Sequence, residues 1–229
     1  MRIKIFADGL DLKQIKKLSG IDGYTFNPSL FRKLKVENYL NFTKKITNLV
    51  NKKSVSIEVI GDNNQTCYKQ AKKISLISNN IFIKIPIMFT NGKSSRKVIQ
   101  NLHKEKIKLN ITAIFTYKQC KEIYNIIGNK TPVILSVFAG RLYDIGIDPT
   151  NEIKKIKRLY RNKKNVKILW ASCRMTYDLK KAEEIGCDII TMPIEMISKI
   201  KKFNTSPIKY SRETVKQFYM DAKKSNFKI

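Results

Sequence analysis

The sequence has few of the residues on which several common active sites depend. Its 229 residues include one histidine, His103, which lies in a lysine-rich stretch. A single histidine excludes a zinc site built on several histidines, and a Ser-His-Asp triad is excluded unless His103 belongs to it. The sequence offers no other metal-binding pattern, so we expect no metal and no other cofactor.

Paired cysteines and long apolar runs are also missing. No two cysteines form a C-x-x-C pair, and we expect free thiols in a reducing compartment. The apolar run within Met1–Asp8 is too short for a signal peptide, and no segment approaches the roughly 20 apolar residues of a membrane span. We therefore expect a cytoplasmic protein that does not bind membranes. The cysteines are Cys67, Cys120, Cys173 and Cys187.

Acidic residues are scarce. The chain has 46 lysines and arginines against 18 acidic residues, which gives a formal net charge of +28. Such a charge is typical of nucleic-acid binding, because cations neutralise phosphates. Here, however, lysine is spread along the whole chain together with asparagine and isoleucine, as in proteins from AT-rich genes, and there is no basic tail or arginine-rich arm. We expect no specific nucleic-acid site, but a surface that attracts anionic substrates.

Short apolar runs rich in β-branched residues alternate with longer segments of helical period. This alternation predicts parallel strands joined by right-handed crossovers, and eight such units predict a parallel (β/α)₈ TIM barrel formed by residues 1–229 as one domain. A doubly wound open sheet is the alternative, but no G-x-G-x-x-G follows the first strand. The predicted strands are Ile3–Asp8, Tyr24–Phe26, Ser54–Ile60, Ile81–Pro86, Leu109–Phe115, Val133–Phe138, Lys167–Ala171 and Asp188–Thr191. The predicted helices are Val36–Asn51, Tyr68–Ile77, Ser94–Glu105, Tyr117–Ile126, Asn151–Arg161 and Met175–Gly186.

One further amphipathic helix follows the eighth unit. We predict it at Ser211–Lys224, within a C-terminal helical extension of residues 208–229. Its apolar stripe needs a cover, which is either its own barrel or a neighbouring subunit. We predict that the helix packs across a subunit boundary. The stripe consists of Val215, Phe218, Tyr219 and Ala222.

Lys84 differs from the other lysines because it interrupts the apolar run Ile81–Phe89. Burial there favours the neutral amine, which is a nucleophile towards carbonyls. The alternative is a lysine at the end of a strand whose stem lies on apolar surface and whose ammonium reaches solvent.

Polar residues recur at the ends of several other predicted strands. The carboxyl ends of barrel strands converge on one active site, and buried charges are rare unless they are paired. Taken together, these residues predict a shared polar pocket around Lys84. They are Asp8, Glu58, Asn110, Thr112, Arg141, Ser172 and Arg174.

Six short motifs resemble, in the same order along the chain, those of the short transaldolase and fructose-6-phosphate aldolase family. The resemblance runs from about Ile5 to Pro193, and the ordered set is far more specific than any single motif. Gly23–Leu30 resembles G-V-T-T-N-P-S-L, Ile83–Pro86 resembles V-K-I-P, Asn110–Thr112 resembles N-V-T, Ser136–Arg141 resembles S-P-F-V-G-R, Ala171–Arg174 resembles A-S-x-R, and Asp188–Pro193 resembles D-I-V-T-V-P.

The resemblance implies a fold, a reaction and a set of roles. Lys84 would form an imine with the donor ketose, Glu58 would act through a water as acid and base, and Asp8 would take the proton of the hydroxyl at the breaking bond. A protonated imine supplies the electron sink, so no metal is required. The resemblance also implies sugar phosphate substrates, a place in the pentose phosphate pathway of carbohydrate metabolism, and a ring-forming homo-oligomer, a pentamer or decamer. The substrate-binding residues would be Asn27, Thr25, Asn110, Thr112, Ser136, Phe138, Arg141, Ser172 and Arg174.

Two positions near the site depart from the family pattern, and two others bear on the reaction. Gly9 and Phe26 stand where the family has threonines, and Phe26 is expected to add bulk beside Asn27. Glu58 and Phe138 are typical of transaldolases, whereas the aldolases tend to have glutamine and tyrosine there. We predict a transaldolase that transfers a dihydroxyacetone unit. The alternatives are an aldolase acting on another sugar, and a basic barrel that binds anionic polymers without catalysis.

Overall fold

Eight parallel strands close into a barrel in the computed structural model, which describes residues 2–225. The strands follow one another around the ring in chain order, and β1 pairs with β8 to close it. The predicted (β/α)₈ barrel is therefore confirmed. The strands are β1 (Lys4–Asp8), β2 (Gly23–Thr25), β3 (Ser54–Glu58), β4 (Ile81–Pro86), β5 (Leu109–Ile114), β6 (Val133–Val137), β7 (Val166–Trp170) and β8 (Ile189–Met192).

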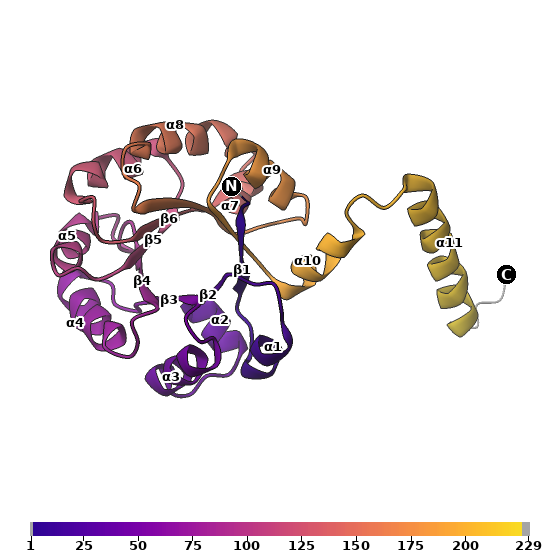
Figure 1. Cartoon of the computed structure of the whole chain (residues 1–229), viewed down its shortest axis with the longest axis horizontal. Helices are drawn as coiled ribbons and strands as arrows, with labels where there is room; N and C mark the ends of the chain where they lie inside the picture. The colour runs from indigo at the N-terminus through magenta and orange to yellow at the C-terminus, as the bar shows by residue number, and fades with distance from the viewer. Residues whose placement is uncertain (1, 226–229) are drawn as a thin grey trace. The chain divides into compact units, whose positions relative to one another are not determined.

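The helices α1 to α9 connect the strands, and α3, α4, α5, α6 and α8 lie outside the ring in Figure 1. All six predicted inter-strand helices are present, with shifted ends. In addition, four helices of six residues each, α1, α2, α7 and α10, were not predicted. The helices are α1 (Leu12–Lys17), α2 (Pro28–Lys33), α3 (Tyr39–Leu49), α4 (Asn64–Ser75), α5 (Arg96–Lys104), α6 (Tyr117–Ile123), η1 (Tyr124–Ile126), α7 (Ala139–Asp144), α8 (Thr150–Tyr160), α9 (Asp178–Ile185), α10 (Ile194–Lys199), η2 (Ile200–Lys202) and α11 (Pro207–Lys224).

Local capping explains where several helices begin and end. α4 begins four residues earlier than predicted, because the side chain of Asn63 accepts a hydrogen bond from the backbone N–H of Thr66. α9 ends at Gly186 as predicted, with φ at 75°, a left-handed conformation that glycine adopts without a steric penalty.

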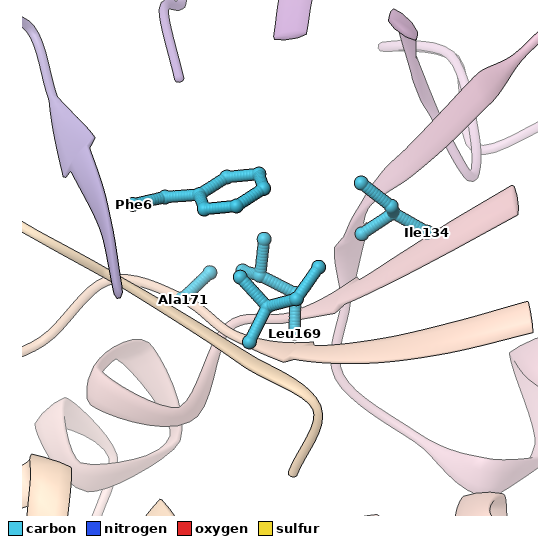
Figure 2. Close-up of a cluster of buried hydrophobic side chains, with 5 residues drawn as sticks. Phe6, Ile134, Leu169 and Ala171 are labelled. Atoms are coloured by element: carbon cyan, nitrogen blue, oxygen red, sulfur yellow. The ribbon is translucent and has the colours of Figure 1, made fainter. Parts of the chain in front are cut away.

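The amino-terminal part of the barrel interior is an apolar plug. Figure 2 shows the ring of Phe6 and the side chains of Ile134 and Leu169 pointing toward one another from β1, β6 and β7, and Ile189 belongs to the same buried cluster. The Phe6 ring occupies space that a side chain on β2 would fill, since a Cβ on Gly23 would lie 2.6 Å from it. The plug closes one end of the barrel and leaves the opposite end for polar groups.

The chain divides into two compact units, Met1–Ile197 and Ser198–Ile229. The first contains the whole barrel. The second contains α11, whose large apolar side chains are exposed, so the predicted helix is present and begins at Pro207. The last four residues of the predicted extension 208–229 lie outside the described residues. None of the described helices is long and apolar enough to cross a lipid bilayer.

Candidate active site

A cavity of about 100 Å³ lies at the carboxyl ends of the strands. This is the end of a TIM barrel where catalytic residues gather. Nine of the twelve residues predicted from the sequence are among those that line it, and the other three, Glu58, Asn110 and Arg174, lie beside or behind this lining. The lining residues are Asp8, Thr25, Asn27, Lys84, Thr112, Ser136, Phe138, Arg141, Ala171, Ser172 and Thr191.

Lys84 lies on the inward face of β4 and is 5% exposed. Strand register pairs it with Glu58 on β3 and with Asn110 on β5. Its Nζ lies 3.1 Å from Oε2 of Glu58, and both side chains are largely buried. The lysine does not reach out to solvent as a strand-end lysine would, and a buried carboxylate is within proton-transfer distance of its amine.

The end of β3 is fixed from outside the barrel. The hydroxyl of Tyr39 on α3 donates a hydrogen bond to the backbone carbonyl of Glu58. Burial raises the pKa of Tyr39, with a smaller contribution from the charge of Glu58, so the phenol stays protonated and remains a donor. Tyr39 thereby holds the backbone that presents the Glu58 carboxylate to Lys84.

Asp8 ends β1 and is reached by a chain of hydroxyl groups. The Oγ1 of Thr25 donates to Oδ1 of Asp8 at 2.7 Å and lies 2.6 Å from Oγ1 of Thr191. Because the Thr25 proton is committed to the carboxylate, Thr191 is the donor of the second bond. Burial raises the pKa of Asp8, against the opposing effects of the Lys84 charge and the Thr25 hydrogen bond. A carboxylate with a raised pKa is suited to accept and return a proton.

Asn110 connects two serines beneath the cavity. Its Nδ2 donates to Oγ of Ser56 at 3.0 Å, and its Oδ1 accepts from Oγ of Ser136 at 2.6 Å. Asn110 and Ser56 are fully buried, whereas Ser136 also lines the cavity. The structure therefore places Asn110 as a support for Ser136 and not in the cavity wall.

Thr112 has a buried hydroxyl without a hydrogen-bond partner among the described residues. It lines the cavity at the end of β5, where the register with β6 shifts between Ile111 and Ile114. Within this bulge Ala113 has φ at 56°, a conformation that costs energy for a residue other than glycine. The bulge thus holds an unused hydroxyl in the cavity, where a water or substrate oxygen would complete its hydrogen bonding.

Asn27 combines a structural and a potential binding role. Its Oδ1 accepts the N–H of Leu30 at 2.9 Å and caps α2, and the cap does not use its amide N–H groups. The neighbouring Phe26 is fully buried and packs on Phe31 and Phe42 at centroid distances of 5.5 and 6.4 Å. Phe26 is not among the residues that line the cavity, so its bulk lies behind Asn27 and not in the cavity wall. It lies on the opposite face of the chain from Thr25.

Gly9 also has a packing explanation. Its φ is 66°, and a Cβ at this position would lie 2.4 Å from Cδ2 of Leu30 on α2. A threonine here would clash with Leu30 in addition to straining the backbone. Glycine therefore allows the β1–α1 turn to pass close to α2.

The opposite wall of the cavity carries Arg141 and Ser172. Arg141 lies on α7, and its guanidinium carbon is 5.9 Å from the centroid of the Phe138 ring. Gly140 brings α7 against the loop after β7, because a Cβ on Gly140 would lie 1.6 Å from the Ser172 carbonyl oxygen. Only glycine allows this close approach.

The structure places Arg174 behind Ser172 and not in the cavity lining. Its Nη1 donates to both the carbonyl oxygen and Oγ of Ser172 at 3.2 Å. Its other edge donates to the carboxylate of Asp144, at 2.8 Å from Nε to Oδ1 and also from Nη2 to Oδ2. Arg141 and Arg174 therefore reach the same wall from different elements.

The sequence interpretation missed three residues that contribute to this arrangement. Thr191 lines the cavity, Ser56 holds Asn110, and Asp144 binds Arg174. Thr191 could have been found from its position at the end of a strand adjacent to β1. No group of three or more His, Cys, Asp or Glu side chains within the described residues is arranged to hold a metal ion. The arrangement offers a buried amine with two carboxylates on one side and a cationic wall on the other.

Comparison with known proteins identifies relatives over nearly the whole chain. The model of the "Transaldolase/Fructose-6-phosphate aldolase" family matches residues 5–229. A "Probable transaldolase" of Brucella melitensis biotype 1 is 32% identical, over 99% of this chain and 100% of that protein. Similarly named proteins of Nitrosopumilus maritimus and Methanococcus vannielii are 32% and 31% identical, over 86% and 89% of this chain and 87% and 91% of theirs.

Solved structures share the fold at low identity. A structure of KGPDC from Streptococcus mutans has a TM-score of 0.57 at 14% identity, with 84% of this chain and 88% of that chain covered. A putative phosphonomutase from Burkholderia cenocepacia has a TM-score of 0.58 at 9% identity, with 94% of each chain covered. At these identities the likeness concerns the barrel fold alone.

Proposed function

Because the chain belongs to the transaldolase/fructose-6-phosphate aldolase family, we propose that it is a transaldolase that works through an imine on Lys84. The enzyme transfers a dihydroxyacetone unit between sugar phosphates, from sedoheptulose 7-phosphate to glyceraldehyde 3-phosphate, with erythrose 4-phosphate and fructose 6-phosphate as products. The observation that carries the proposal is the buried Lys84 amine, 3.1 Å from the Glu58 carboxylate and in the same cavity wall as Asp8.

The first step forms the imine. Glu58 takes a proton from the Lys84 ammonium, and the neutral amine attacks the ketone carbon of the donor. A C–N bond forms, the C=O π bond breaks, and a proton passes from the nitrogen to the oxygen. The resulting carbinolamine loses this oxygen as water, with Glu58 supplying the proton. A water held by Glu58 and the free hydroxyl of Thr112 would relay it, which is consistent with the unpaired Thr112 hydroxyl. The protonated imine then withdraws electrons from the adjacent carbon.

The second step breaks the carbon–carbon bond. Asp8 takes the proton of the hydroxyl on the carbon beyond the breaking bond, the bond electrons move to the imine nitrogen, and an aldose leaves. An enamine of the three-carbon unit stays on Lys84. The raised pKa of Asp8 supports this role, and so does the Thr191–Thr25 hydroxyl chain, which orients one carboxylate oxygen and leaves the other for substrate. In the reverse sense, the same groups join the enamine to an acceptor aldehyde.

The remaining wall binds the rest of the sugar phosphate. Asn27 and Ser136 would hold sugar hydroxyls, and Thr25 and Asn110 would fix their neighbours Asp8 and Ser136. The phosphate would lie against the wall of Arg141, Ser172 and Arg174, where forked guanidinium groups suit its oxygens. The high positive charge would help to attract such substrates. Binding to nucleic acid through this charge would be weak, unspecific and lost with added salt.

Glu58 and Phe138 favour transfer over free aldol cleavage. Phe138 lines the cavity, and its ring centroid is 6.0 Å from that of Phe115. A tyrosine hydroxyl there could position a water that releases the enamine as dihydroxyacetone, but phenylalanine cannot. The enamine would therefore persist until an acceptor arrives.

The test measures dihydroxyacetone release from fructose 6-phosphate with and without erythrose 4-phosphate as acceptor. A transaldolase transfers the unit to the acceptor and releases little dihydroxyacetone alone, and Phe138→Tyr shifts the balance toward release. If the wild-type protein releases dihydroxyacetone as fast without acceptor as with it, the chain is an aldolase acting on this or another sugar.

We also propose that the protein is a cytoplasmic homo-oligomer. α11 exposes large apolar side chains, including Ile208, Val215 and Phe218 at 81, 63 and 66% exposure. Such a stripe is stabilised when another protein surface covers it. A neighbouring subunit of a ring-forming assembly would provide that cover.

A further inference from the structure

Asp144 is an exposed carboxylate at the last position of α7, three residues after Arg141. It accepts two hydrogen bonds from one edge of the Arg174 guanidinium, through Nε and Nη2. These bonds, with a smaller effect from the Arg141 charge, hold the pKa of Asp144 below its usual range. The carboxylate is therefore ionised at neutral pH, and the pair is bidentate and charge-assisted.

The two ends of the Arg174 guanidinium have different partners. The Nε/Nη2 edge faces Asp144, whereas Nη1 donates to the carbonyl oxygen and Oγ of Ser172. Ser172 lines the cavity, and Asp144 does not. The Nη1 end of Arg174 is therefore the end nearest to the cavity, and Asp144 holds the rear edge of the same planar group.

The backbone that carries Arg174 is fixed as well. The fully buried Asp178 accepts the N–H of Arg174 at 2.7 Å and the N–H of Met175 at 3.2 Å through Oδ2. With the base of the arginine held in this way, the remaining freedom lies in its long side chain. Arginine side chains have many rotamers, and a partner that accepts from two nitrogens selects one orientation of the plane.

We propose that Asp144 is a positioning residue for the phosphate-binding wall, and that it holds Arg174 so that its Nη1 end meets a substrate phosphate beside Ser172 and Arg141. The inference rests on the proposed function, since it assumes that an anion binds at this wall. The short helix α7 then contributes two residues to this wall. It presents Arg141 directly, and it holds Arg174 through Asp144.

The Asp144 carboxylate also repels a bound phosphate, which would weaken phosphate binding. We expect this repulsion to be smaller than the gain from holding Arg174 in place. Asp144 is exposed, so water and salt screen its repulsion of an anion. The bidentate hydrogen bonds to Arg174 act at contact distance, so salt weakens them less than the longer-range repulsion. Removal of the carboxylate should therefore weaken phosphate binding and not strengthen it.

The experiment measures binding of inorganic phosphate to the full-length protein by calorimetry, and steady-state kinetics with fructose 6-phosphate. In Asp144→Asn we expect the phosphate Kd and the KM to rise about tenfold, the loss expected when a charge-assisted donor is no longer held in place. We expect kcat to change much less than KM. Asp144→Glu should recover part of the affinity, because it restores a carboxylate that can reach the guanidinium.

Asp148→Asn is the matched control. Asp148 is also exposed, and its Oδ1 accepts the N–H of Thr150 at 2.8 Å instead of binding an arginine. The control removes the same charge from the same region, and we expect Kd and KM to change by less than about twofold. An equal loss in both variants would mean that the loss does not depend on the contact with Arg174, and would overturn the proposal.

A double substitution separates action through Arg174 from other effects. If Asp144 acts by positioning Arg174, Asp144→Asn adds no further loss to Arg174→Ala. A full additional loss, or tighter phosphate binding in Asp144→Asn, would contradict the inference. The calorimetric readout does not depend on turnover. A protein without transaldolase activity that still shows the Asp144 effect on phosphate binding would refute the proposed function alone, whereas an active protein without the effect would refute the inference alone.

Discussion

The inward faces of the barrel strands differ between the amino end and the carboxyl end. On β1 the inward residue changes from Phe6 to Asp8, and on β4 from Phe82 to Lys84. β6 changes in the same way from Ile134 to Ser136. The same two-residue step thus replaces an apolar plug with a polar site on strand after strand. The division assigns stability to one half of the interior and chemistry to the other.

Cavity size alone would not have pointed to the carboxyl end. A hollow of about 270 Å³ lies at the amino end, lined by Phe6, Phe82 and Lys4 among others, whereas the carboxyl-end cavity is about 100 Å³. The smaller cavity contains the buried amine, a carboxylate with a raised pKa and an unpaired hydroxyl. The nature of the groups that converge identifies the site better than the volume around them.

The strongest test of this division is the same substitution at both ends. Lys84→Met removes the amine that we propose forms the imine, and we expect turnover of fructose 6-phosphate with erythrose 4-phosphate to fall to background. Methionine keeps most of the buried volume, so the fold should survive. Lys4→Met at the amino end is the control and should change turnover by less than about twofold, as for most surface substitutions. Measurable turnover in Lys84→Met would break the assignment.

A substitution in the apolar plug should lower stability and leave substrate binding unchanged. Phe6→Ala leaves a cavity in the apolar cluster and should reduce the free energy of unfolding by about 3–5 kcal/mol, measured by urea denaturation. The folded fraction should keep its KM for fructose 6-phosphate, because Phe6 does not line the carboxyl-end cavity. Intact stability with impaired binding would show that the two halves are not divided as described.

Removal of α11 leaves both halves of the interior intact and tests assembly alone. A chain ending near Pro207 should form a smaller assembly than the full-length protein, because the apolar stripe of α11 is then lost. Light scattering gives the mass of each. An unchanged mass would count against a subunit contact through this helix.

The smallest expected effect concerns His103 on α5, outside the barrel interior. Its Nε2 accepts the N–H of Gly128 at 2.7 Å, and burial, with the charge of Lys163, lowers its pKa below 6.5. There is therefore a pH range in which His103 is neutral in the native state but already protonated in the unfolded chain. The contribution of His103 to the free energy of unfolding is complete above about pH 6.5. It is lost as the pH falls through the lowered pKa of the folded state.

His103→Gln keeps an acceptor for Gly128 and removes the titrating group. Urea denaturation at pH 5 and pH 7.5 should show a smaller difference in unfolding free energy for this variant than for the wild type. Equal differences in the two proteins would assign the acid sensitivity to other groups. Activity at neutral pH should be unaffected, since the histidine is not part of the carboxyl-end cavity lining.

Much of the site could be predicted because it depends on strand periodicity. Lys84, Glu58 and Asp8 interrupt or end apolar strands, and parallel strands bring such positions to one end of the barrel. The same periodicity places Phe26 opposite Thr25, and Phe26 is fully buried.

The parts that could not be predicted depend on loops and short helices. The contact of Asp144 with Arg174 joins α7 to the loop after β7, 30 residues away. The bulge at Ala113 and the close approach at Gly140 arise from packing between elements. Six-residue helices such as α1 and α7 contain too few turns for an apolar period to be visible. Local patterns carry no information about these contacts.

We propose that one buried lysine among 46 lysines and arginines, Lys84, forms an imine with the donor sugar. Borohydride reduces such an imine to a stable secondary amine, so the modified residue can be mapped by mass spectrometry after incubation with fructose 6-phosphate. We predict a single modified residue, Lys84, and no modification without the sugar. Trapping at another lysine, or turnover without any trapped adduct, would contradict it.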